Sequence, residues 1–149
     1  MKTHYLGHIV FYIRDLEKSL NFYEKLLGLK RIEGGRLPFK AAALTSGRTH
    51  HELLLIEVGD APGPIPGPRR GFYHAGFKIG DSVNELKKAY DELQVAGVEV
   101  KGQSDHTVSK SLYVFDPDGN EIELYVDDPK VDWESDPTAV LSPIKPLEL

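Results

Sequence analysis

The sequence predicts an α+β fold built from two β-α-β-β-β modules, and three observations support this. First, His8 and His74 each open an apolar, strand-like run, and an aspartate follows seven residues later, Asp15 and Asp81 respectively. Second, each aspartate precedes apolar residues at helical spacing, and both pairs of equivalent residues lie 66 positions apart. Third, a stretch rich in Pro and Gly, residues 59–71, separates the two halves and predicts a stiff, extended linker.

The first module spans residues 4–58. Its strands are expected at residues 5–13, 29–33, 39–46 and 51–58. Between the first two strands, Leu16, Leu20, Tyr23 and Leu27 recur at helical spacing. Asp15 is the expected N-cap of this helix, and Gly28 is expected to end it.

The second module spans residues 72–127 and repeats this order. Its strands are expected at residues 73–79, 98–102, 110–115 and 121–126. Val83, Leu86, Tyr90 and Leu93 mark its helix, which Gly97 ends, and residues 116–119 (Asp-Pro-Asp-Gly) predict a turn. The Pro-rich tail, residues 128–149, is expected to run over the surface with Trp133 as its anchor.

The composition predicts one soluble domain over residues 1–149. The net charge is −5 and no basic residues cluster, which argues against a nucleic-acid partner. With no cysteine in the chain, any metal must be held by nitrogen and oxygen ligands. The chain has no apolar run near the roughly 20 residues of a membrane span and no apolar leader at its start, so we expect a cytoplasmic protein without membrane contact.

Three residues are the candidate metal ligands: His8, His74 and Glu123. A single histidine at the start of a strand is usually structural. Here the two histidines occupy equivalent places in a repeat, and Glu123 lies on the last strand of the second module. Two histidines and one carboxylate form a metal site with open coordination positions.

These patterns resemble the vicinal oxygen chelate superfamily, which includes glyoxalase I, bleomycin-resistance proteins and type I extradiol dioxygenases. The resemblance covers roughly residues 4–127. It implies a cup-shaped mixed sheet, formed by both modules around a divalent metal, with ligands on the first and last strands of the modules. It also implies a homodimer, because small members of the family often complete the cup by dimerisation.

The internal repeat predicts how many protein ligands the metal has. Gly28 matches Gly97, so the offset between the modules is 69 after the helix, and Leu54 then matches Glu123. In the family both of these last strands can supply a carboxylate, but leucine cannot bind a metal. Three ligands favour an oxygenase over an isomerase. The alternative is that Glu52, two residues from Leu54, supplies a fourth ligand.

Two further stretches resemble the type I extradiol dioxygenases. They are residues 49–55 (Thr-His-His-Glu-Leu-Leu-Leu) and residues 105–125, which run from Asp-His-Thr-Val-Ser to Glu-Ile-Glu-Leu-Tyr. The resemblance implies that His51 is the acid–base catalyst, and that His106 and Tyr113 hydrogen-bond substrate and oxygen species. Imidazole titrates near neutral pH and suits the first role. We expect His50 to be a polar strand-start residue and His4 to lie on the surface.

The expected function is therefore an Fe(II)-dependent extradiol dioxygenase that cleaves a catechol-type ring with O₂, with Mn(II) as the alternative metal. Two other functions remain open. One is a glyoxalase- or epimerase-like metal enzyme, which predicts O₂-independent turnover and a fourth ligand. The other is a metal-free protein that binds small molecules such as drugs, which predicts no bound metal.

Overall fold

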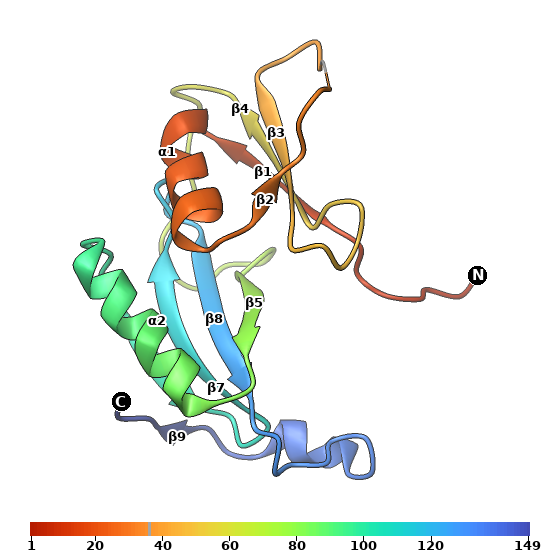
Figure 1. Ribbon diagram of the computed structural model, residues 1–149, viewed down its shortest axis with the longest axis vertical. Coiled ribbons are helices and arrows are strands. Elements are labelled where there is room, and N and C mark those ends of the chain that lie inside the picture. Colours follow the sequence, from red (N-terminus) through yellow and green to blue (C-terminus); the bar gives the residue numbers. More distant parts are fainter. Residues whose placement is uncertain (36) are drawn as a thin grey trace. The chain divides into compact units, whose positions relative to one another are not determined.

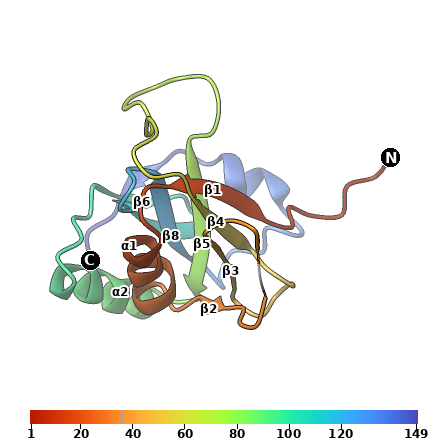
Figure 2. The same ribbon diagram turned by 90° about the horizontal axis from the view of Figure 1, so that it is seen from above.

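Two mixed β-sheets, one in each half of the chain, confirm the predicted α+β fold (Figures 1 and 2). The computed structural model describes residues 1–35 and 37–149, so residue 36 of the expected first module lies outside the described residues. The chain divides into two compact units, Met1–Pro64 and Ile65–Leu149. The division falls inside the predicted Pro/Gly linker.

The first unit has the predicted β-α-β-β-β order. Its elements are β1 (Ile9–Ile13), α1 (Leu16–Leu20), the π-helical turn η1 (Asn21–Leu26), β2 (Lys30–Arg31), β3 (Ala41–Thr45) and β4 (Leu53–Glu57). The strand order is β1-β4-β3-β2, with β1 parallel to β4 and the other pairs antiparallel. Asp15 caps α1 by accepting a hydrogen bond from the Lys18 backbone N–H at 3.1 Å, as predicted.

The second unit repeats that order and adds two elements from the tail. It contains β5 (His74–Gly80), α2 (Val83–Val95), β6 (Gly102–Asp105), β7 (Ser109–Phe115), β8 (Glu121–Asp127), the 3₁₀ helix η2 (Pro137–Leu141) and β9 (Lys145–Pro146). The strand order is β5-β8-β7-β6-β9, again with the first pair parallel. Gly97 ends α2 with a φ of 71°, close to the 77° of Gly28, so both predicted stop signals adopt the left-handed conformation.

Helix α2 covers one face of the second sheet and leaves the other face for polar residues. Ser82 caps the helix by accepting a hydrogen bond from the Glu85 backbone N–H. The Glu85 carboxylate in turn accepts from the Ser82 hydroxyl at 2.7 Å and from the Asp81 backbone N–H at 2.9 Å, an arrangement similar to a capping box. Leu86 and Leu93 are buried on the helix face toward the sheet, where α2 lies along β7 and β8 (Figure 1). Buried and half-buried residues alternate along β8, which fixes its two faces.

Three expectations about the fold are wrong. The strand expected at residues 98–102 lies at Gly102–Asp105, because pairing with β7 outweighs the apolar composition of the preceding residues. The first strand begins at Ile9 rather than at residue 5. Trp133 is 54% exposed and does not anchor the tail, which instead pairs through β9 with β6. No helix over the described residues has the length and apolar content needed to cross a bilayer.

Candidate active site

The polar face of the second sheet gathers four of the predicted site residues: His74, Glu123, His106 and Tyr113. His74 begins β5 and pairs in register with Glu121 on β8, so His74 and Glu123 lie on neighbouring strands. His74 Nε2 is 3.2 Å from Glu123 Oε2, and both side chains are largely buried. The two predicted metal ligands of this unit are therefore in contact.

His74 also presents its second ring nitrogen to a carboxylate. His74 Nδ1 is buried and, among the described residues, has no hydrogen-bond partner. Glu121 Oε1 lies 3.7 Å from it, just beyond hydrogen-bond length. A carboxylate behind one ring nitrogen favours the proton on that nitrogen and leaves the other nitrogen free to act as a ligand. Glu121 was not predicted, although its position two residues before Glu123 places it on the same face.

A chain of hydrogen bonds links His106 to Glu123 through Tyr113. His106 Nε2 lies 2.7 Å from the Tyr113 hydroxyl, and that hydroxyl donates to Glu123 Oε1 at 3.2 Å. A hydroxyl has only one proton, so with Tyr113 donating to Glu123, His106 Nε2 must carry the proton that Tyr113 accepts. The two residues predicted to hydrogen-bond substrate, His106 and Tyr113, are therefore in contact with each other.

Ser111 is a site residue that the sequence reasoning missed. It is fully buried on β7, and its hydroxyl donates to Glu123 Oε1 at 2.6 Å. The signal was present in the sequence, because Ser111 lies two residues before Tyr113 and shares its face of the strand. Two hydroxyl donors therefore fix one oxygen of Glu123, while the other oxygen faces His74.

Tyr73 and Tyr113, which lie near these residues, stay neutral at physiological pH. Burial and the negative charge of Glu123 raise the pKa of Tyr113 well above its ordinary value. A hydrogen bond to Glu121 raises the pKa of Tyr73, whose ring lies 4.5 Å from the His74 ring between centroids. Tyr113 is thus a neutral hydrogen-bond donor, as its predicted role requires.

His106 lies next to a strained residue in the β6–β7 hairpin. Thr107 has a φ of 70°, a left-handed conformation that β-branched residues rarely adopt. Its hydroxyl is buried and, within the described part of the chain, has no hydrogen-bond partner. Strain of this kind costs about 1–3 kcal/mol and persists only where neighbouring contacts impose it.

We expect Thr107→Gly to stabilise the protein by about 1 kcal/mol. Glycine adopts this φ without strain, and the gain exceeds the roughly 0.5–1 kcal/mol that its flexibility costs in the unfolded chain. Thermal unfolding should show a midpoint about 2–4 °C higher. Thr107→Val, which keeps the branched side chain, should not raise the midpoint. An equal rise in both variants would point to the buried hydroxyl rather than to the backbone.

Three histidines form the candidate site of the first unit. The His8 and His51 ring centroids are 4.4 Å apart, and those of His50 and His51 are 4.5 Å apart. Burial, followed by the nearby His8 and His50, lowers the pKa of His51 below its ordinary value. His51 is therefore neutral at neutral pH and able to accept a proton. His50 also belongs to this cluster, whereas we expected it to be only a polar residue at the start of a strand.

The strand register reproduces the internal alignment of the two modules. Val10 on β1 pairs with Leu54 on β4, and Gly76 on β5 pairs with Glu123 on β8. Leu54 thus holds the position in the first sheet that Glu123 holds in the second. A side chain at Gly76 would place its Cβ 3.4 Å from Glu123 Oε2, so glycine keeps the space above this carboxylate open.

The predicted residues form two groups, one in each unit. His74, Glu123, His106 and Tyr113 belong to the second group, and His8 and His51 to the first. Over residues 1–35 and 37–149, no three His, Asp or Glu side chains converge closely enough to hold a metal ion. The chemistry of the available donors, imidazole nitrogen and carboxylate oxygen, nevertheless suits a divalent first-row metal. The buried Nδ1 of His74 beside Glu121 also fits a histidine prepared to ligate.

Comparison with known proteins places the chain in a family. The profile of the Glyoxalase/Bleomycin resistance protein/Dioxygenase superfamily matches residues 5–124. The chain belongs to this superfamily. A crystal structure of a glyoxalase/dioxygenase from Nostoc punctiforme has the same fold, with a TM-score of 0.68 over 83% of this chain and 90% of that one at 23% identity.

Relatives in the superfamily carry different activities. The catechol-2,3-dioxygenase of Bacillus subtilis (strain 168) is 35% identical over 90% of this chain, which spans only 45% of that protein's length. The metallothiol transferase FosB of Lysinibacillus sphaericus (strain C3-41) is 31% identical, and the match covers 84% of each protein. Membership therefore gives the fold, whereas the activity has to be argued from the site.

Proposed function

We propose that this chain is an Fe(II)-dependent extradiol dioxygenase that cleaves a catechol-type ring with O₂. The observation that carries the proposal is the contact between His74 and Glu123 in one module, combined with Leu54 at the place of a second carboxylate in the other. His8 completes the ligand set. Three protein ligands leave positions open for two ring oxygens and O₂.

The proposed metal would be Fe(II), with Mn(II) as the alternative, held by His8, His74 and Glu123. When bound, it would orient the diol and O₂ and act as a Lewis acid toward the diol oxygens. Both units would then belong to one domain, as expected from the sequence. The proposal also includes a homodimer, as in the expectation from the sequence.

His51 would be the base that accepts a proton from the diol. Its lowered pKa keeps it neutral, and its ring lies next to the proposed ligand His8. His106 and Tyr113 would donate hydrogen bonds to substrate oxygens, because both already form a chain that ends on Glu123. Because Tyr113 is neutral, its hydroxyl proton would be available for a hydrogen bond to a substrate oxygen.

Glu52 is the residue that would change this proposal, because a fourth ligand would favour an isomerase. Its carboxylate accepts hydrogen bonds from the backbone N–H and the hydroxyl of Ser46 at 2.9 and 2.8 Å, and Arg48 lies 3.5 Å away. These partners satisfy the carboxylate within its own unit. Glu52 directly precedes Leu53, the partner of Ile9 on β1, so Glu52 lies opposite His8 rather than Val10. In the second module His74 pairs with Glu121, so Glu52 corresponds to Glu121 and not to Glu123.

The test is anaerobic reconstitution with Fe(II), followed by oxygen uptake and absorbance with a panel of catechols. We expect uptake of O₂ and a yellow ring-fission product. Turnover of an α-oxo thiol adduct or an epimerisable substrate without O₂, with Ni, Zn or Co, would favour the glyoxalase- or epimerase-like alternative. Failure to retain any metal would favour a binding protein, and either result would reject the dioxygenase.

Ser111→Ala should weaken metal binding by about 10–100-fold, because it removes the shorter of the two hydroxyl contacts that orient Glu123. Chelator competition measures the affinity. Ser104→Ala, on the neighbouring strand opposite Ser111, is the matched control and should bind metal normally. Unchanged affinity in Ser111→Ala would show that Ser111 does not orient the ligand.

A further inference from the structure

A largely buried lysine, Lys110, ties down the hairpin that carries His106, and it has no part in the proposed reaction. Its Nζ lies 2.6 Å from Asp128 Oδ2, 3.3 Å from the Thr107 carbonyl oxygen and 3.6 Å from Asp105 Oδ1. The Lys110 side chain is only 13% exposed. One ammonium group thus connects both ends of the hairpin loop to the first residue after β8.

Hydrogen bonds from backbone N–H groups also hold the same loop. The Asp105 carboxylate accepts from the Thr107 N–H at 2.7 Å, and the Val108 carbonyl accepts from the Asp128 N–H at 2.9 Å. Together with Lys110, these contacts impose the left-handed conformation of Thr107. The loop conformation in turn sets where the His106 ring meets the Tyr113 hydroxyl.

Stability alone is a poor explanation for a buried ion group. Removing charges from water is costly, and well-packed apolar residues often stabilise a protein as much as a buried salt bridge does. The hydrogen bond from Lys110 lowers the pKa of Asp128, so this carboxylate is charged at neutral pH. An ammonium group with two hydrogen-bond acceptors and a further carboxylate in fixed directions instead specifies one geometry of the chain.

We propose that Lys110 is a positioning residue, which holds the His106 ring against Tyr113, and that Asp128 at the start of the C-terminal segment is its counter-charge. The importance of this geometry for turnover rests on the proposed function. The geometry itself belongs to the second unit alone and can be measured in the metal-free protein. The two proposals can therefore fail separately.

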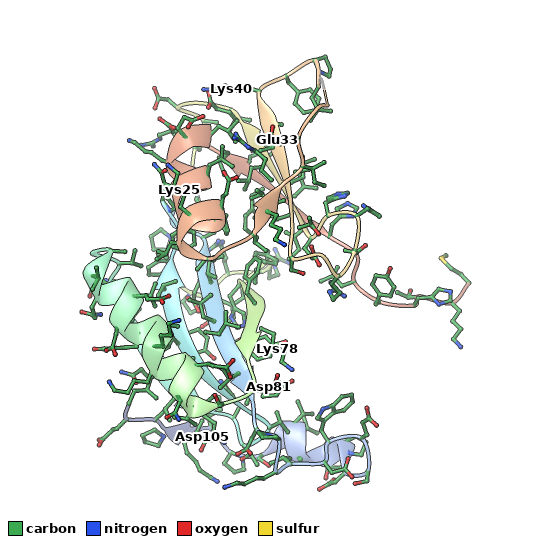
Figure 3. All side chains as sticks on the ribbon, in the orientation of Figure 1. Lys25, Glu33, Lys40, Lys78, Asp81 and Asp105 are labelled. Carbon is green, nitrogen blue, oxygen red and sulfur yellow. The ribbon has the colours of Figure 1, made fainter. Side chains whose placement is uncertain are left out.

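The test compares the histidine ring nitrogens of wild type and Lys110→Met by long-range ¹H–¹⁵N NMR on metal-free protein. We expect the His106 Nε2 signal to move to the position of a solvent-exposed ring in Lys110→Met and to return in Lys110→Arg. Lys78→Met is the matched control. Lys78 also contacts two carboxylates, Asp81 at 2.6 Å and Asp127 at 2.7 Å, but lies on β5, at the other side of the sheet from Asp105 (Figure 3).

If Lys110→Met does not fold, the double variant Lys110→Met, Asp128→Asn removes both charges and gives the same readout. In an active preparation, kcat should fall by up to about 100-fold while KM stays nearly constant, because a misplaced His106 affects the reaction more than binding. An unchanged His106 signal in either folded variant would overturn the proposal. A shift of the His106 signal in Lys78→Met as well would show that losing any lysine–carboxylate contact on this sheet has this effect, and would also overturn the proposal.

Discussion

Glu123→Gln should lose metal affinity by more than about 100-fold and should show no ring cleavage at micromolar Fe(II). Glutamine keeps the size of the side chain and can still accept hydrogen bonds from Ser111 and Tyr113. It lacks the negative charge that a carboxylate ligand brings to a divalent cation. Metal content after gel filtration and chelator competition measure the loss.

Glu121→Gln is the matched control for this prediction. Glu121 lies two residues from Glu123 on the same face of β8. Its carboxylate lies near Nδ1 of His74, whereas Glu123 contacts Nε2 of the same ring. We expect its replacement to cost only about 10–100-fold in metal affinity, as for a residue that orients a ligand. If Glu123→Gln bound metal as tightly as the wild type, the proposed ligand set would be wrong.

His51→Gln should lower kcat by about 10²–10⁴-fold and leave metal content unchanged. The variant removes the proposed base but none of the three proposed ligands. Oxygen uptake at saturating catechol, with iron measured in the same sample, separates the two effects. His4→Gln is the control, because His4 is exposed and has no proposed role.

Two results would contradict the assignment of His51. Full activity in His51→Gln would exclude it as the base. Loss of activity together with loss of iron would instead indicate that His51 is a ligand, which its position beside His8 makes worth testing. The variant His50→Gln then tests whether the neighbouring His50 has the same role, because its Nδ1 lies 2.5 Å from Nδ1 of His51.

The sequence predicts the fold well because residues in each module mark where its helix begins or ends. Asp15 caps the first helix, and Gly28 and Gly97 end both helices in the conformation that glycine favours. The β6 strand was misplaced because its residues, Gly-Gln-Ser-Asp, have low strand propensity and are held by pairing with β7. Tertiary pairing of this kind leaves no local signal.

The candidate site was predictable where a repeat or a motif marks it, and less so elsewhere. Tyr113 and Glu123 pair directly across β7 and β8, as the turn between them implies. Ser111 and Glu121 were missed because single polar residues on a strand usually face solvent. The strain at Thr107 and the burial of Lys110 depend on contacts between distant segments, which no periodicity reveals.

The order of strands has a consequence for how this protein responds to its surroundings. β1 and β5 each lie at the end of their own sheet, and His8 and His74 stand where these strands begin. An end strand can accept a further strand through its outer backbone groups. Any segment that pairs with these end strands would restrain the adjacent imidazole. If copies of the chain associate through β1 or β5, retention of the proposed metal should therefore vary with protein concentration.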